Sequence, residues 1–166
     1  LEKTMGGLIQ SRLDKLVNLF PLEIQQKIQV LANYSGRNLT IDNPSHPCAC
    51  LAEIEQFPET SIDNLELWKG LANLFLTHDN TCRKRPDVRL GFPPNKDPNA
   101  KQMKDDFINI VDLLQKNPAT LRTLASVKKL PRSHFTDAEW DLLKSTIRLL
   151  AEINKNLKHV FSSRQV

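Results

Sequence analysis

Residues 67–93 read LWKGLANLFLTHDNTCRKRPDVRLGFP, and they join an apolar run to a cluster of basic residues. The apolar run contains Trp68 and continues through Leu71 and Phe75 at three- and four-residue steps, which predicts an amphipathic helix. The basic cluster follows within a few residues, and a Gly-Phe-Pro turn closes the stretch. The sequence therefore predicts a helical base that presents a positively charged loop.

Helical periodicity extends from this stretch in both directions. Upstream, it predicts helices over residues 5–20 and 21–33, a stop at Ser35-Gly36, a loop over 38–47 and a short helix over 48–57. Downstream, it predicts a helix through 103–114 and another that starts at Pro118 behind an Asn117 N-cap. Thr136-Asp137-Ala138-Glu139 has the form of a capping box and predicts the start of a long helix that reaches Phe161.

Residues 77–99 form the longest stretch without helical periodicity, and they contain four prolines and Gly91. A loop of this length in a compact domain is uncommon and is usually functional or disordered. No segment alternates for long enough to predict a strand. The predicted fold is all-α: a single compact helical domain over residues 1–166, with about six or seven helices and one long basic, proline-rich loop.

Length and composition limit the classes of protein to which this sequence can belong. No run approaches the roughly 20 apolar residues of a membrane-spanning helix, and the first residues do not resemble a signal peptide. The cysteine count is three, which argues against a disulfide framework and favours a reducing cytosol. Because the chain begins with Leu1 and stops at Val166 inside a helical pattern, we expect it to be a piece of a longer protein.

Signatures of catalysis are absent from the sequence. It has no GxxxxGK[ST] loop, no GxGxxG and no HExxH, and its four histidines are dispersed, so we expect no catalytic residue and no cofactor site in this chain. His46, Cys48 and Cys50, with Cys82 or His78, contain the ligand types of a zinc site. Their spacing does not match the common zinc motifs, so the sequence favours cysteines that pack as small apolar residues, and no metal site is predicted.

Positive charge is concentrated after residue 82. Residues 83–104 contain seven basic and two acidic residues, a larger excess than the net charge of +4 of the whole chain. Such a cluster suits sequence-independent contact with phosphates. The predicted phosphate contacts are Arg83, Lys84, Arg85 and Arg89, with Lys96, Lys101 and Lys104 as a second group.

Two other interpretations of these residues stay open: a solvated loop, or arginines that cap the C-termini of neighbouring helices. Lys128 and Lys129, with Arg132, form a second and weaker basic group. Trp68 and Trp140 could stack on bases, but their positions on apolar helical faces favour packing in the core.

The order of clusters in the central stretch resembles a known family. Its matching positions are Trp68, Leu71-Ala72, Leu74-Phe75-Leu76-Thr77, Arg83-Lys84 and Gly91-Phe92-Pro93. They resemble subdomain 1B, the helical insertion of UvrD/Rep-type superfamily 1 DNA helicases, especially the AddA- and RecB-like helicase–nuclease branch. Leu130-Pro131, Trp140 and the long helix ending at Phe161 are also similar to this family, as is the helix containing Arg12, although the Asp and Trp that usually follow that arginine are missing.

The resemblance covers about residues 8–166 and implies an accessory subdomain of an ATP-dependent DNA helicase, with or without a nuclease domain. It implies contact with the backbone of duplex or forked DNA, without sequence preference, in DNA repair or recombination in a bacterial cytoplasm. ATP and Mg would bind the motor domains of the parent protein, which would be the other partners of this subdomain. We expect the chain itself to be a monomer without enzymatic activity. The alternative is a helical protein–protein interaction module with no nucleic-acid role.

Overall fold

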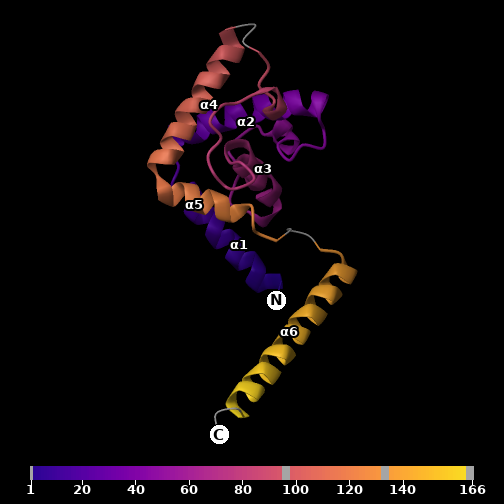
Figure 1. The fold of residues 1–166 in the computed structure, drawn as a ribbon. Coiled ribbons are helices and arrows are strands. Elements are labelled where there is room, and N and C mark those ends of the chain that lie inside the picture. The colour runs from indigo at the N-terminus through magenta and orange to yellow at the C-terminus, as the bar shows by residue number, and fades with distance from the viewer. Residues whose placement is uncertain (1, 95–97, 132–134, 164–166) are drawn as a thin grey trace. The chain divides into compact units, whose positions relative to one another are not determined.

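The computed structural model describes residues 2–94, 98–131 and 135–163. The chain divides into two compact units, Leu1–Ser133 and His134–Val166, which are described separately. Figure 1 shows the six α-helices of the described residues: α1 (Glu2–Val17), α2 (Leu22–Asp42), α3 (Leu65–Phe75), α4 (Pro98–Lys116), α5 (Pro118–Val127) and α6 (Asp137–Ser163). The described residues also form three short 3-10 helices: η1 (Ala49–Glu53), η2 (Ile62–Asn64) and η3 (Val88–Leu90). The described residues contain no strand, only an isolated bridge between Leu76 and Cys82, so the predicted all-α fold is confirmed.

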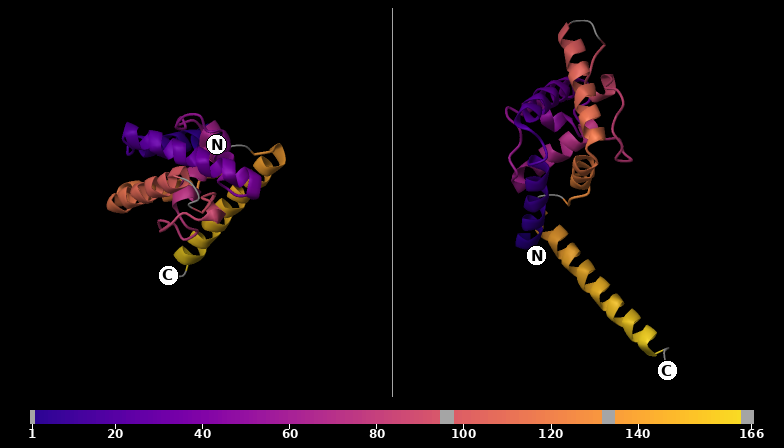
Figure 2. Two further views of the ribbon diagram at one scale, coloured as in Figure 1. Left: turned by 90° about the horizontal axis from the view of Figure 1, so that it is seen from above. Right: turned by 90° about the vertical axis from the view of Figure 1, so that its left-hand side faces the viewer.

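Helix α3 lies at the centre of the first unit (Figures 1 and 2), and most of its residues are buried in the core. Trp68 is fully buried, and its ring meets the ring of Phe57 edge-on at a centroid distance of 5.2 Å. Its indole Nε1 donates a hydrogen bond of 3.0 Å to the carbonyl of Glu59, so burial leaves no polar atom unpaired. The expected packing role of Trp68 is confirmed. The high apolar content of α3 follows from this position, because neighbours surround most of its surface.

The predicted stop at Ser35 and Gly36 is wrong, because α2 continues through both residues to Asp42. Ser35 is fully buried, and its hydroxyl donates a hydrogen bond of 2.7 Å to the carbonyl of Leu90. A Cβ on Gly36 would lie 2.3 Å from the backbone nitrogen of Ala52. These two residues therefore allow other segments to approach the helix closely, which is a packing requirement and not a helix end.

Polar side chains on α2 hold the irregular segments of the first unit in place. Gln29 and Asn33 donate to the carbonyls of Ile54 and Ala52, at 3.0 and 2.8 Å. Asn38 donates to the carbonyl of Gly91 at 2.8 Å. Buried backbone groups that lie outside regular helices need such partners, because an unpaired one is costly. Two sides of α2 thus supply these hydrogen bonds: Gln29 and Asn33 bond the segment around η1, and Asn38 bonds the segment after η3 on the opposite side.

Several other boundaries differ from the prediction. The short helix expected over 48–57 is the 3-10 helix η1, and residues 38–42 of the predicted loop belong to α2. Helix α5 begins with Pro118 at its first turn, as predicted. Asn117 occupies the N-cap position, but its side chain donates backwards to the carbonyl of Leu113 at 2.9 Å and caps no helical N–H. It therefore bonds the end of α4 instead of the start of α5.

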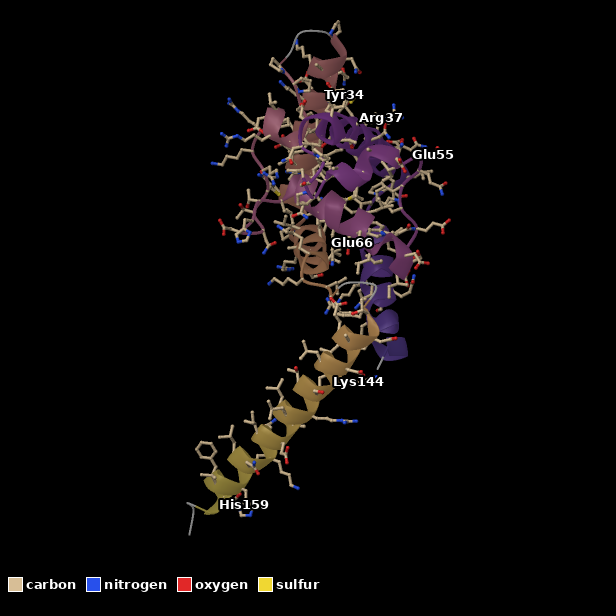
Figure 3. All side chains as sticks on the ribbon, turned by 90° about the vertical axis from the view of Figure 1, so that its right-hand side faces the viewer. Tyr34, Arg37, Glu55, Glu66, Lys144 and His159 are labelled. Carbon is tan, nitrogen blue, oxygen red and sulfur yellow. The ribbon has the colours of Figure 1, made fainter. Side chains whose placement is uncertain are left out.

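The second unit consists of helix α6 and the residues just before it. The predicted capping box is confirmed: the backbone N–H of Glu139 donates to Thr136 Oγ1 at 3.3 Å, and the N–H of Thr136 donates to Glu139 Oε2 at 2.9 Å. Trp140 is half-buried beside Phe135. Figure 3 shows side chains along the length of α6, with Lys144 towards its start and His159 towards its end. Among the helices of the described residues, none has the length and apolar character needed to cross a membrane.

Candidate nucleic-acid interface

The predicted basic loop begins at a tight reversal directly after α3. Leu76 pairs with Cys82, and the backbone N–H of Thr77 donates to the carbonyl of Thr81 at 2.8 Å. The N–H of Arg83 then donates to the carbonyl of Phe75 at 2.9 Å. Asn80 takes the left-handed conformation, with φ of 61°, which an asparagine tolerates better than most residues. The reversal brings the basic residues back alongside the C-terminal end of α3.

Two cationic side chains bond carbonyls here, one in the last turn of α3 and one in the turn that follows it. Arg83 is half-buried, and its Nε donates to the carbonyl of Asn73 at 3.1 Å. Lys128, which directly follows α5, donates from Nζ to the carbonyl of Thr77 at 2.8 Å. The last carbonyls of a helix lack intrahelical partners and carry partial negative charge, so cations are stabilising there. Arg83 therefore fills the capping role that was one alternative for the loop arginines.

The other end of the loop is fixed against α2. Gly91 has φ of +80°, and a Cβ at this position would lie 2.4 Å from the carbonyl oxygen of Ser35, so both its backbone angle and its surroundings require glycine. The next residue, Phe92, is fully buried and packs against Phe107 and Tyr34 at centroid distances of 5.3 and 5.7 Å. With the hydrogen bonds from Ser35 and Asn38, these contacts tie the Gly-Phe-Pro turn to α2.

Between the two ends, the loop presents Lys84, Arg85 and Arg89 to solvent. Within the described residues, these three side chains form no ion pair and no hydrogen bond. Pro86 is buried among them and adds a further contact with the body of the unit. The loop thus presents three exposed cations against one exposed acidic residue, Asp87, on a backbone that is anchored at both ends.

The second group of predicted phosphate contacts, Lys96, Lys101 and Lys104, does not lie together on the loop. Lys101 and Lys104 lie on α4 and not on the loop, with Lys101 exposed and Lys104 half-buried. Lys96 lies outside the described residues. Among the described residues, the loop therefore contains only the first group of predicted phosphate contacts, Arg83, Lys84, Arg85 and Arg89.

Three titratable groups around the end of α3 have shifted pKa values. Burial, and then the charge of Arg83, lower the pKa of His46, whose Nδ1 accepts a hydrogen bond of 3.1 Å from the N–H of Cys48. Burial raises the pKa of Cys48 to about 12. Burial and the nearby Arg83 lower the pKa of Lys128, while Asp79 raises it. For both His46 and Lys128, burial is the larger cause of the lowered pKa, and the positive charge of Arg83 adds to it.

The cysteines make contacts of their own with backbone carbonyls. Cys48 donates from Sγ to the carbonyl of Gly70 at 3.5 Å, and Cys50 donates to the carbonyls of Pro47 and Glu66 at 3.2 and 3.6 Å. Burial is the largest cause that raises the pKa of all three thiols, Cys48, Cys50 and Cys82, which favours their protonated form. The described residues contain no group of three or more His, Cys, Asp or Glu side chains placed to hold a metal ion.

No family model, curated protein or solved structure matches the chain. The resemblance to helicase subdomain 1B therefore stays a prediction that depends on the residues quoted for it. The structure shows how the residues that carry this resemblance are arranged in the described part of the chain.

The structure brings together residues that the sequence separates widely. Sequence reasoning grouped Arg83, Lys84, Arg85 and Arg89 by proximity in the chain, and these four do lie on one anchored loop. It set Lys128 apart as part of a weaker basic group, whereas Lys128 bonds the base of this same loop. No sequence signal could have joined Lys128 to Thr77, since a contact across 51 residues depends on how α5 packs against α3.

Proposed function

We propose that this chain is an accessory subdomain that binds the sugar–phosphate backbone of DNA through the loop over residues 83–92. The observation that carries the proposal is the set of three exposed, unpaired cations, Lys84, Arg85 and Arg89, on a loop anchored at both ends. Anchoring matters because a loop that is already ordered loses little conformational entropy when it binds. Uncompensated cations matter because neutralising phosphates releases counterions, which supplies most of the affinity in non-specific binding.

The same features argue against sequence-specific recognition. Phosphate contacts fix position but carry no information about the bases. Trp68 is fully buried and cannot stack on a base, and Phe92 is equally inaccessible. The loop presents long, charged side chains together with exposed Val88, while Leu90 and Phe92 are buried. We therefore propose binding to the backbone of duplex or forked DNA without sequence preference.

The proposal extends to a parent protein through the resemblance described above. The chain would be the 1B insertion of a UvrD/Rep-type DNA helicase, in a bacterial cytoplasm, and the remaining motor domains would be its other partners. ATP and Mg would be bound by those domains, which supply the hydrolysis that drives translocation. This chain would contribute only the contact with DNA.

The test is DNA binding measured against salt. A fluorescein-labelled fork of arbitrary sequence is titrated with the chain, and anisotropy gives the affinity between about 25 and 200 mM salt. Each phosphate contact contributes about −0.9 to the slope of log K against log salt, so three contacts predict a slope of about −2.7. Replacing Lys84, Arg85 and Arg89 by Met should remove most of that slope and lower the affinity at low salt more than tenfold.

A matched control removes the same charge elsewhere. Lys15, Lys27 and Lys116 are exposed and lie on three other helices, so their replacement by Met changes the net charge equally. This control should keep most of the slope. Absence of binding by the original chain at 25 mM salt, or equal losses in both triple variants, would show that the loop is not a phosphate-binding surface.

The alternative, a protein–protein interaction module, has one observation in its favour. Several large apolar side chains of α6 are exposed within the described residues, among them Leu150 and Phe161. If the chain keeps its helical fold but does not bind DNA at low salt, that result favours the protein–protein interaction module.

A further inference from the structure

The base of the loop contains two cations that are only partly engaged. Arg83 uses Nε to bond the carbonyl of Asn73, and Lys128 uses one Nζ hydrogen to bond the carbonyl of Thr77. A guanidinium carries five N–H donors and an ammonium carries three, so each side chain keeps most of its donors. Both stems are fixed by their carbonyl bonds, so the remaining donors are held in place near the surface. Neither group forms an ion pair in the described part of the chain.

These two cations lie close enough to affect each other. The guanidinium of Arg83 contributes to the lowered pKa of Lys128, as expected for like charges without an anion between them. The hydrogen-bond geometry leads to the same conclusion independently. The side chain of Arg83 bonds Asn73, its backbone N–H bonds Phe75, and Lys128 bonds Thr77. The three carbonyl partners therefore lie within residues 73–77, at and just after the end of α3.

The other charges at this place leave the positive sign in excess. The carbonyl end of a helix is equivalent to about half a negative charge, against two full cations. His46 is kept neutral by its lowered pKa, and Cys48 is a protonated thiol at ordinary pH. The negative charge of Asp79 raises the pKa of Lys128, but among the described residues the two side chains form no ion pair. An anion that binds here would relieve the repulsion between the two cations.

We propose that Arg83 and Lys128 form a subsite for one phosphate group of a nucleic-acid backbone. This rests on the proposed function and deepens it, because it extends the contact surface from the loop to the end of α5. Lys128 would then have two roles: it holds the reversal at Thr77, and it binds a phosphate beside those contacted by Lys84 and Arg85. Because its donors are already fixed, the subsite would bind a phosphate group without reordering the loop.

The experiment must separate a phosphate ligand from a residue that only positions the loop. Salt-dependent binding to the same labelled fork is measured for four chains: the original, Lys128→Met, the double variant Lys84→Met with Arg85→Met, and the combined triple variant. If Lys128 binds a phosphate itself, Lys128→Met lowers the slope by about 0.9 in both backgrounds. If Lys128 acts only by positioning Lys84 and Arg85, its replacement has no further effect once those two are gone.

Three outcomes are distinguishable. If the original chain does not bind DNA, the proposed function itself is wrong. Binding in which Lys128→Met is silent in the double-variant background would overturn the subsite and leave the proposed function standing. An additive loss, with Lys27→Met as an unaffected control, would support the subsite.

A second variant keeps the test decisive if Lys128→Met fails to fold, which circular dichroism would show. Asp79→Asn leaves the bonds of Arg83 and Lys128 in place and removes the competing carboxylate. It should tighten DNA binding about two- to fivefold at low salt, in keeping with the modest strength of surface charge interactions. Unchanged or weaker binding by Asp79→Asn would overturn the subsite.

Discussion

At the scale of single residues, missing side chains matter as much as those present. Gly36 lies in the middle of α2, where glycine normally weakens a helix, yet a Cβ there would approach the backbone of Leu51 and Ala52 to within 2.8 Å. The backbone cannot move aside as the end of a flexible side chain could. The close approach of η1 to α2 therefore depends on hydrogen at this position.

Replacing Gly36 by Ala should destabilise the first unit despite the higher helix propensity of alanine. The propensity gain is about 1 kcal/mol, whereas forcing an extra carbon into a packed site costs typically about 1–3 kcal/mol. A contact of 2.3 Å with backbone places this site at the upper end of that range. Urea unfolding would measure the net loss in the free energy of unfolding.

Gly7 provides the matched control, because it also lies inside a helix but has nothing within 4 Å of an added Cβ. Gly7→Ala should stabilise the chain by up to about 1 kcal/mol. If both substitutions stabilise the chain, the tight packing of η1 on α2 is incorrect.

At the scale of elements, local signals and tertiary contacts predict different features. The starts of α5 and α6 were predictable, because Pro118 and the Thr136–Glu139 capping box act within a few residues of themselves. The end of α2 was not, since Ser35 and Gly36 resemble a helix stop unless Leu90 and Ala52 are known to lie against them. For the same reason the sequence identified the charged loop residues but could not show that Arg83 bonds α3 while Lys84 and Arg85 are free.

The capping box of α6 allows a direct test of one such local signal. Thr136→Ala removes the hydroxyl that accepts from the N–H of Glu139 and should destabilise the first turn by about 1 kcal/mol. Amide hydrogen exchange over residues 137–141 should become about fivefold faster. Thr146 is exposed in the middle of α6, and its hydroxyl donates to the carbonyl of Leu142, so Thr146→Ala should leave exchange in that first turn unchanged. Equal effects of the two substitutions would argue against the cap.

At the scale of the whole molecule, the buried core is confined to the first unit. Every residue of the described hydrophobic core lies between Ile9 and Leu130. The second unit has its own short-range stabilisation, from the capping box and from the contact between Phe135 and Trp140. The first unit therefore contains the apolar burial that cooperative folding requires.

A chain that ends at Ser133 should accordingly fold and unfold in one cooperative transition. It retains Trp68 as its only tryptophan, and burial of that ring predicts blue-shifted fluorescence that shifts to the red on unfolding. Trp140→Phe in the full chain isolates the same signal for comparison. Red-shifted emission before heating, or a broad transition in the shortened chain alone, would show that the first unit cannot fold by itself.

The hydrogen-bonding side chains of α2 have a consequence for changes in chain length. Gln29, Asn33, Ser35 and Asn38 each meet a fixed carbonyl on a neighbouring segment. Deleting one residue between Gln29 and Asn38 would turn everything beyond it by about 100° around the helix axis, so the later donors would face away from their acceptors. An insertion at exposed positions 43–45, just after α2, leaves that register intact. Homologues of this chain should therefore differ in length after α2 and hardly ever within it.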